Sequence, residues 1–265
     1  MVYPVNVLTR NTVNQTMIDV ANMTSPEIRE AMEQGTTTAI YAVGSNEQHG
    51  PVLGVCTDTK LGDALALRVA EKLGNSHKYP TVNVGCSEHH MKFPGTLTLR
   101  KETLQNILKD ITRSLARHGY KRIIVLPSHG GNFGPVEEVS NELKEMNPDV
   151  EIITYTDLTG FVEYLTTTSE RFGISPEDSG AHAGESEVSM MLYANPEGVR
   201  TKKIPEGKGY LGAFDEAATE KIFSEGIGGL SPIGVLGDPA EASKEHGAAY
   251  IEAIATAMVE YIKAQ

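Results

Sequence analysis

Residues 122–134 read Arg122-Ile-Ile-Val-Leu-Pro-Ser-His129-Gly-Gly-Asn132-Phe-Gly134, and they contain the clearest buried strand in the chain. The apolar run at 122–126 is short and rich in β-branched residues, which favours a strand covered on both faces. A histidine among glycines follows it, and a helical segment is expected at 134–146. Because packing explains such a histidine poorly, this turn is a candidate for chemistry. The alternative is a glycine-rich turn with an incidental histidine.

The alternation of strand and helix extends in both directions from this segment. Apolar runs predict strands at 38–43, 81–84 and 151–155, and apolar stripes predict helices at 60–73 and 101–118. Further helices are expected at 24–35, around 188–193, and from Asp238-Pro-Ala-Glu to about residue 262. Strands alternating with helices of this length indicate an α/β fold, with a mostly parallel sheet covered by helices on both sides. In such sheets, ligands bind at the carboxyl ends of the strands.

Composition narrows the possible partners. The chain has 265 residues, a net charge of −12 and two cysteines, Cys56 and Cys86, too few for a disulfide scaffold or a Cys-rich zinc module. Its acidic surplus repels phosphate backbones and anionic lipids, so neither a nucleic acid nor a membrane is an expected partner. No apolar stretch has the length of a membrane span, and the first residues lack a signal-peptide pattern. A cytoplasmic location is therefore expected.

A second candidate site follows the strand expected at 38–43. It reads Gly44-Ser-Asn-Glu47-Gln-His49-Gly-Pro51, with Asp58 at the start of the next helix. Glu47 and His49 are two residues apart, so in extended backbone their side chains point to the same side. Carboxylate and imidazole ligands suit zinc, manganese or similar divalent ions. Alternatively, Glu47 and His49 are exposed loop residues and Asp58 caps a helix.

A third candidate segment is Gly180-Ala-His182-Ala-Gly-Glu185-Ser-Glu187-Val-Ser189. It places one imidazole and two carboxylates within six residues. A helix that begins near residue 184 would put Glu185 and Ser189 on one face and point Glu187 elsewhere, toward a ligand. Alternatively, the carboxylates only complement the helix dipole.

A weaker fourth segment is Ser87-Glu88-His89-His90. Adjacent histidines in a strand point to opposite faces, so at most one of them would face a site. His90 or Glu88 could line a pocket, or the segment could be a solvated loop.

Taken together, these motifs resemble the creatininase family of metal-dependent amidohydrolases. The resemblance rests on four segments, which are Gly44-Ser-x-Glu47-Gln-His49-Gly-Pro51 with Asp58, Phe93-Pro-Gly-Thr96, Ser-His129-Gly-Gly-Asn132, and His182-Ala-Gly-Glu185-x-Glu187-x-Ser189. It implies a three-layer α/β/α sandwich with a mostly parallel central sheet, formed by one domain over residues 1–265. It also implies a homo-oligomer, for which a hexamer is plausible.

The resemblance further implies two divalent metal ions per subunit, Zn²⁺ or Mn²⁺ with Fe²⁺ as an alternative. Asp58 would bridge them, Glu47 and His129 would hold one ion, and His49 the other. Creatininase draws one more carboxylate from the position of Gly131, so Glu185 is expected to be the substitute ligand. The expected catalytic residues are His182, as a proton shuttle, and Glu185. The expected substrate-binding residues are Ser87, His90, Gly130, Gly131, Asn132 and Glu187.

The expected reaction is hydrolysis of a C–N bond in a small cyclic amide or formamide by metal-activated water. Backbone N–H groups near Gly130 and Gly131 would stabilise the oxyanion. Creatinine is a doubtful substrate, because creatininase closes tryptophans over its ring and this chain has none. Two alternatives remain open. One is hydrolysis of a C–C bond in a cyclic diketone of the 3-dehydro-scyllo-inosose type from inositol breakdown. The other is a non-catalytic metal-binding or interaction protein.

Overall fold

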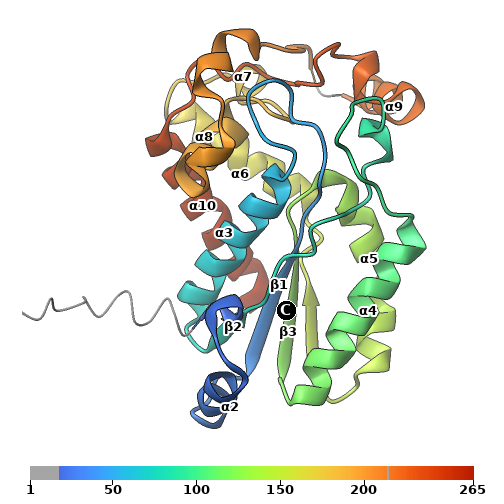
Figure 1. The fold of residues 1–265 in the computed structure, drawn as a ribbon, viewed down its shortest axis with the longest axis vertical. Helices are drawn as coiled ribbons and strands as arrows, with labels where there is room; N and C mark the ends of the chain where they lie inside the picture. The colour runs from blue at the N-terminus through green and yellow to red at the C-terminus, as the bar shows by residue number, and fades with distance from the viewer. Residues whose placement is uncertain (1–17, 214) are drawn as a thin grey trace, which may run out of the picture.

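A parallel four-stranded sheet forms the centre of the computed structural model, which describes residues 18–213 and 215–265 (Figure 1). The strand order is β2-β1-β3-β4, with β2 at Ser76–Lys78, β1 at Thr38–Val43, β3 at Arg122–Pro127 and β4 at Glu151–Thr154. In register, Thr38 of β1 pairs with Arg122 of β3, which pairs with Glu151 of β4. Residues 1–17, where no signal peptide is expected, lie outside the described part of the chain.

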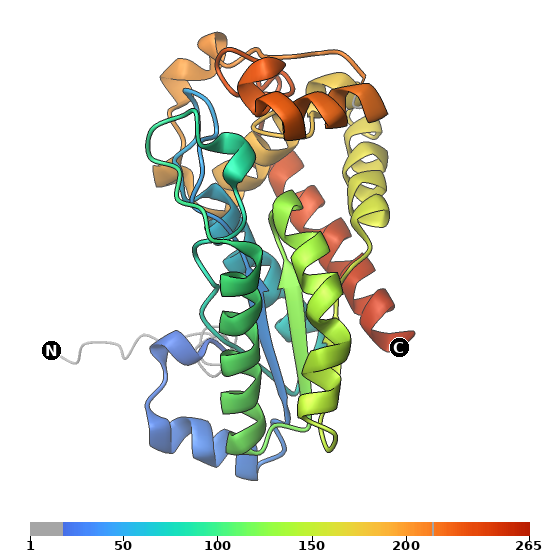
Figure 2. The same ribbon diagram turned by 90° about the vertical axis from the view of Figure 1, so that its right-hand side faces the viewer.

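The two faces of the sheet belong to separate hydrophobic cores. Along β1, Ile40 and Ala42 join one core, while Ala39, Tyr41 and Val43 join the other. The first core is shared with α3 (Thr57–Leu73), α8 (Glu185–Ala194) and α10 (Lys244–Lys263), and the second with α4 (Lys101–His118) and α5 (Phe133–Met146). Figures 1 and 2 show these helices on opposite sides of the strands, which confirms the three-layer α/β/α sandwich.

The remaining elements are short or lie outside these layers. They are η1 (Val20–Asn22), α2 (Ser25–Glu33), η2 (Glu88–His90), η3 (Gly130–Asn132), α6 (Leu158–Glu170), α7 (Pro176–Ser179), η4 (Pro196–Gly198), η5 (Thr201–Glu206), α9 (Glu216–Glu225) and η6 (Ile227–Gly229). None of the helices within the described ranges has the length and apolar character that crossing a bilayer requires.

Two predicted elements are wrong. Residues 81–84 form no strand, since Val82 makes only an isolated bridge to Val43, and the edge strand β2 lies at Ser76–Lys78. The last helix does not open at Asp238. Its cap is Ser243, whose side chain accepts a hydrogen bond from the His246 backbone N–H, whereas the Asp238 carboxylate accepts one from Ala240 within a turn.

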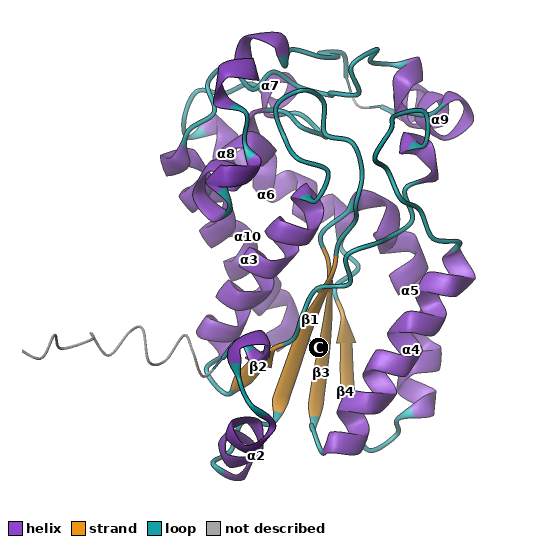
Figure 3. Cartoon of the chain, in the orientation of Figure 1, coloured by secondary structure: helices purple, strands orange, loops and turns teal. Residues whose placement is uncertain are grey.

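The loops that follow the strands gather beyond the carboxyl end of the sheet (Figure 3). The loop after β1 leads into α3, the turn after β3 contains η3, and β4 is followed by α6. Parallel strands therefore bring together the segments around residues 47, 58 and 129, which are far apart in the sequence.

Candidate metal centre

Asp58 lies at the centre of a buried polar cluster. It is in the first turn of α3 and is only 2% exposed. Its Oδ1 lies 3.4 Å from Nε2 of His49, and its Oδ2 lies 3.4 Å from Nδ1 of His129. The two oxygens of one carboxylate therefore face two different imidazoles.

Glu47 completes the group around His129. It is 1% exposed, and its Oε2 lies 3.2 Å from the Nε2 of His129. One ligand atom each from Glu47, Asp58 and His129 can be chosen so that all lie within 4.8 Å of one another. Such a set of one imidazole and two carboxylates can hold a divalent cation.

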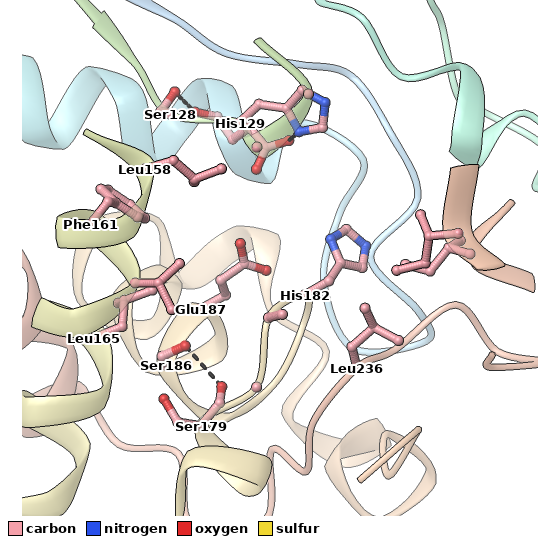
Figure 4. Close-up of a pocket in the computed structure, with 18 of the residues that line it drawn as sticks. Ser128, His129, Leu158, Phe161, Leu165, Ser179, His182, Ser186, Glu187 and Leu236 are labelled. Carbon is pink, nitrogen blue, oxygen red and sulfur yellow. Dashed lines mark hydrogen bonds and ion pairs between the residues drawn. The ribbon is translucent and has the colours of Figure 1, made fainter. Parts of the chain in front are cut away.

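Glu187 stands on the other side of His49. Its Oε2 lies 3.5 Å from the His49 Nε2, and the backbone N–H of Ala183 donates to the same oxygen. His49, His182 and Glu187 form a second group of potential ligands within 4.8 Å, and Glu47, His90 and His182 form a third. Figure 4 shows the Glu187 carboxylate pointing into the space between His182 and His129.

Hydrogen bonds orient the ring nitrogens of two histidines. The His49 Nδ1–H donates to the Glu47 carbonyl oxygen at 3.1 Å, so Nε2 is the ring nitrogen that faces Asp58 and Glu187. The His182 Nε2–H donates to the Gln48 carbonyl at 2.8 Å, so the free lone pair is on Nδ1. Backbone carbonyls commonly fix metal-ligating histidines in this way.

Two atoms of the cluster show that the ligand set fits a cation. Within the described residues, the His49 Nε2 and the Asp58 Oδ2 are buried and have no hydrogen-bond partner. Buried polar atoms without partners are rare in folded proteins, because each costs about 1–3 kcal/mol. Since both atoms face other potential ligands, coordination of a cation would satisfy them.

The carboxylates and imidazoles of the cluster shift one another's pKa values. Burial opposes ionisation of Glu47, but His129, His90 and His182 hold its pKa well below the usual range. Burial also opposes protonation of His49, yet Asp58 and Glu187 raise its pKa to about 10. Burial likewise opposes protonation of His129, but Glu47 and Asp58 raise its pKa to about 9.

Burial dominates the titration of two other groups. It raises the pKa of Glu187 to about 7, even though His49 lies close by. It lowers the pKa of His90 to about 3, which keeps that imidazole neutral at pH 7. The ring of His90 lies with its Nε2 3.4 Å from the Glu47 Oε1.

The structure does not bring Glu185 into the cluster. Its carboxylate is fully buried, accepts hydrogen bonds from Ser189 at 2.7 Å and Tyr250 at 2.6 Å, and lies 2.8 Å from the His246 Nδ1. Residues two apart on a helix point roughly 200° apart, so Glu185 faces α10 while Glu187 faces the cavity. As expected, Glu185 and Ser189 share a face, but the carboxylate beside His49 is that of Glu187.

Ser87 and Asn132 do not line the cavity and instead contact the loops beside the cluster. The Asn132 amide donates to the carbonyls of Val43 and Gly44 and accepts from the Cys86 N–H, each at 3.0 Å. The Ser87 hydroxyl lies 2.5 Å from that of Ser45, which donates to Glu47. Both residues therefore stabilise the loops that position the polar cluster.

Gly130 and Gly131 line the cavity at the start of η3. A side chain at Gly131 would collide with the Cys86 carbonyl oxygen and the His129 ring. The backbone can approach His129 this closely only because residue 131 has no side chain. The site therefore leaves no space for a carboxylate at residue 131.

Sequence reasoning missed His89 and Gln48. Residues 88–90 form η2 instead of a strand, so His89 lines the cavity together with His90, which was expected there. Gln48 has no obvious metal-binding chemistry, yet its Nε2 donates to the Gly234 carbonyl at 3.0 Å and lies 3.0 Å from the His90 Nδ1. The available signal was the position of Gln48 between Glu47 and His49.

A cavity of about 410 Å³ opens from the cluster. Its polar end is lined by Glu47, Asp58, His129, His182 and Glu187. Apolar side chains line much of the rest, including Leu61, Leu65, Phe133, Leu158, Phe161, Val162, Leu165, Met190, Ile222, Ile227 and Leu236. Figure 4 labels four of them, Leu158, Phe161, Leu165 and Leu236. Reactive groups at one end of a largely apolar cavity are typical of a small-molecule site.

Comparisons with known proteins agree with this architecture. The family model described as creatinine amidohydrolase matches residues 21–262. A mycofactocin precursor peptide peptidase from Mycolicibacterium smegmatis is 30% identical over 213 residues, covering 78% of this chain and 77% of the relative. A 3-dehydro-scyllo-inosose hydrolase from Thermotoga maritima is 29% identical over 246 residues, covering 88% and 78%.

Solved structures show the same fold. A crystal structure of creatinine amidohydrolase superposes with a TM-score of 0.78 at 23% identity, covering 92% of this chain and 96% of that one. Two further creatininase structures, described as a manganese form and as a Zn-Zn type, each superpose with a TM-score of 0.76. From the family match, the fold and the ligand cluster together, we conclude that the chain belongs to the creatininase family of hydrolases.

Proposed function

We propose that this protein hydrolyses a C–N bond of an amide or formamide at a centre of two divalent ions. Glu47, Asp58 and His129 would hold one ion, and His49, Asp58 and Glu187 the other. The observation that carries the proposal is the placement of the two Asp58 oxygens, each 3.4 Å from a different imidazole. When bound, the ions would polarise the substrate carbonyl and lower the pKa of a water molecule to roughly 7.

In this proposal Glu187 takes the ligand role that the resemblance suggested for Glu185. Two contacts support Glu187 as the ligand in place of Glu185. The Glu187 Oε2 lies 3.5 Å from the His49 Nε2, and Glu185 is buried against Tyr250. The closed space around Gly131 supports it further, since the second ion needs a carboxylate from another segment. Glu185 therefore has no catalytic role in the proposal.

His182 would move the proton between the attacking water and the leaving nitrogen. The Gln48 carbonyl holds its Nε2–H, so Nδ1 is the atom that accepts and returns the proton. Gly130 and Gly131 line the cavity beside His129, where their backbone N–H groups would stabilise the developing oxyanion. His90, which lines the cavity with its Nε2 3.4 Å from the Glu47 Oε1, would help to orient the substrate.

Substitution of Asp58 tests the two-ion centre. Asp58→Ala should lose both metal ions and reduce amide hydrolysis to background, because one carboxylate serves both ions. Metal content per chain and kcat/KM measured on the same preparations would check this. Retention of two ions by this variant would refute the bridging role. A wild-type protein that does not bind about two ions per chain would favour a non-catalytic role.

A second candidate is C–C bond hydrolysis in a cyclic diketone, and the similarity to the 3-dehydro-scyllo-inosose hydrolase favours it. A polarised carbonyl is common to both reactions, so the polar cluster does not separate them. The apolar lining of the cavity favours the amide over a polyhydroxylated ring. Product analysis distinguishes the two, since an amide releases an amine or formate and a diketone gives an open-chain keto acid.

Zn²⁺ and Mn²⁺ are the ions proposed, in line with the descriptions of solved creatininases, and Fe²⁺ is an alternative. We also propose a small-molecule substrate and a homo-oligomer, with a hexamer as the plausible form. Elemental analysis and light scattering would test these points. The single domain over residues 1–265 and the cytoplasmic location stay predictions.

A further inference from the structure

One wall of the cavity is an apolar face of α6. Leu158, Phe161, Val162 and Leu165 all line the cavity, and their spacing places them on one face of the helix. Figure 4 shows Leu158, Phe161 and Leu165 on the side of the cavity opposite His182 and Leu236. We call these four side chains the α6 stripe.

Part of the α6 stripe is not covered by the protein itself. Leu158 is 41% exposed and Val162 is 49% exposed, while Phe161 and Leu165 pack partly against the core. The stripe is continuous with the polar end of the cavity, because Glu187 and His129 line the same space. Exposed apolar side chains beside reactive groups are typical of a binding site.

The opposite wall is apolar as well. Ile222, Ile227 and Leu236 form a small cluster of their own and face the cavity from the segment around α9 and η6. At about 410 Å³ the cavity lies within the range of roughly 300–1,000 Å³ usual for organic ligands. A small polar amide would leave most of it unfilled.

We propose that the substrate carries a bulky apolar group beside its scissile bond and that this group packs against the α6 stripe. The inference rests on the proposed amide hydrolysis and specifies its substrate class, an amide with a branched aliphatic or aromatic substituent. The metal cluster would hold the carbonyl, and the apolar group would displace water from Leu158 and Val162. A ligand covered with hydroxyl groups would lose hydrogen bonds to water against the same wall.

Hydroxamates test the inference without requiring turnover, because they chelate metal ions and can carry different substituents. Binding of acetohydroxamate and phenylacetohydroxamate would be measured by calorimetry on the Mn²⁺-loaded protein. The wild type should bind phenylacetohydroxamate at least about tenfold more tightly. In the double variant Leu158→Asn/Val162→Asn, this preference should fall to about threefold or less.

Tyr164→Asn is the matched control. Tyr164 lies on the same helix and is 39% exposed, but it does not line the cavity. This variant should keep the full preference for phenylacetohydroxamate, and equal metal content in all three proteins would show that the centre is intact. Equal affinity of the wild type for both hydroxamates would overturn the inference, as would failure to bind either, or an equal loss of preference in Tyr164→Asn.

Hydrolysis separates this inference from the proposed function. Among amides that differ only in a methyl, isobutyl or benzyl group beside the scissile bond, kcat/KM should rise with the size of the group. Cleavage of all three at equal rates would leave amide hydrolysis standing and remove the inference. A hydroxamate preference without cleavage of any amide would refute the proposed function while supporting the apolar subsite.

Discussion

Glu185 and Glu187 lie on the same turn of α8 but have opposite environments. Glu185 is fully buried, and it accepts hydrogen bonds from the hydroxyl groups of Ser189 on its own helix and Tyr250 on α10. Glu187 lines the cavity and faces His49. One carboxylate thus stabilises the packing of two helices, and the other is available for a ligand.

Replacing each glutamate by glutamine should therefore have different effects on metal binding and on protein stability. Glu187→Gln should lower metal content and destabilise the metal-free protein less than Glu185→Gln does, because burial of the Glu187 carboxylate offsets part of its attraction to His49. Glu185→Gln should keep the ligand set but lower the free energy of unfolding of the metal-free protein by about 1–3 kcal/mol, because buried hydrogen-bond partners are left unmatched. Elemental analysis and urea denaturation would check both variants. The reverse pattern would return Glu185 to the ligand set.

Protons should compete with metal ions at His49 and His129. In the metal-free site the pKa of His49 is raised to about 10 and that of His129 to about 9, so both imidazoles are in the positively charged, doubly protonated form at pH 7.5. Metal binding requires neutral imidazoles and should therefore release protons. Calorimetric titration with Zn²⁺ in two buffers of different ionisation enthalpy would measure that release. No buffer dependence at pH 7.5 would contradict the raised pKa values.

The same shifts determine how pH affects the stability of the metal-free protein. The folded-state pKa values of His49 and His129 lie above the unfolded value of about 6.5, so the folded state binds more protons between these limits. Their stabilising contribution is complete below about pH 6.5 and is lost as pH rises through 9 to 10. Thermal unfolding of metal-free protein should show Tm falling from pH 7 to pH 10.

At the scale of elements, the buried strands and amphipathic helices could be predicted from the sequence. β1 and α4 have the predicted bounds, 38–43 and 101–118, because their apolar patterns are unambiguous. β2 could not be found in this way, since Ser76-His-Lys78 has no apolar pattern and only its pairing with β1 makes it a strand. Tertiary hydrogen bonding here overrides local preference.

The start of α10 shows that a helix-cap sequence pattern can occur where no helix begins. Asp238-Pro-Ala-Glu has the composition of a helix start, but the helix begins at Lys244 with Ser243 as its cap. Ser243→Ala should destabilise the protein by about 1 kcal/mol, since the His246 N–H loses its acceptor. Thr256→Ala, on the same helix, is the matched control and should be nearly neutral. Urea denaturation would measure both, and equal effects would argue against a specific cap.

In the candidate site, the residues that follow strands could be predicted from the sequence. Glu47, Asp58 and His129 come together because the carboxyl ends of parallel strands share one edge of the sheet. The choice between Glu185 and Glu187 depended on the rotation of α8 about its axis. That rotation is determined by packing against α10, which the sequence pattern does not specify.

At the scale of the whole molecule, the proposed ions would join segments that are distant in the chain. Ligands from the loop after β1, the turn after β3 and the start of α8 would meet at one centre. Removal of metal by a chelator should therefore lower Tm, by several degrees at saturating metal. Asp58→Ala should show almost no change in Tm on chelation. A wild-type Tm that is unaffected by chelator would indicate that the ligands are not joined by metal.

The apolar cavity also belongs to this scale, and it could not be read from the sequence. Its walls come from α3, α5, α6 and α9, and the residues that form them have the ordinary apolar spacing of core helices. Only the assembled fold shows that the α6 stripe borders an open space. Periodicity identifies an apolar face but does not show what covers it.

The close packing around Gly131 limits which residues can replace this glycine. With the Cys86 carbonyl and the His129 ring in the way, an acidic residue introduced here alone has no room to reach an ion. A carboxylate at residue 131 would therefore need an accompanying shift of the chain near residue 86, so the replacement of Gly131 alone should disturb the positions of both Cys86 and His129.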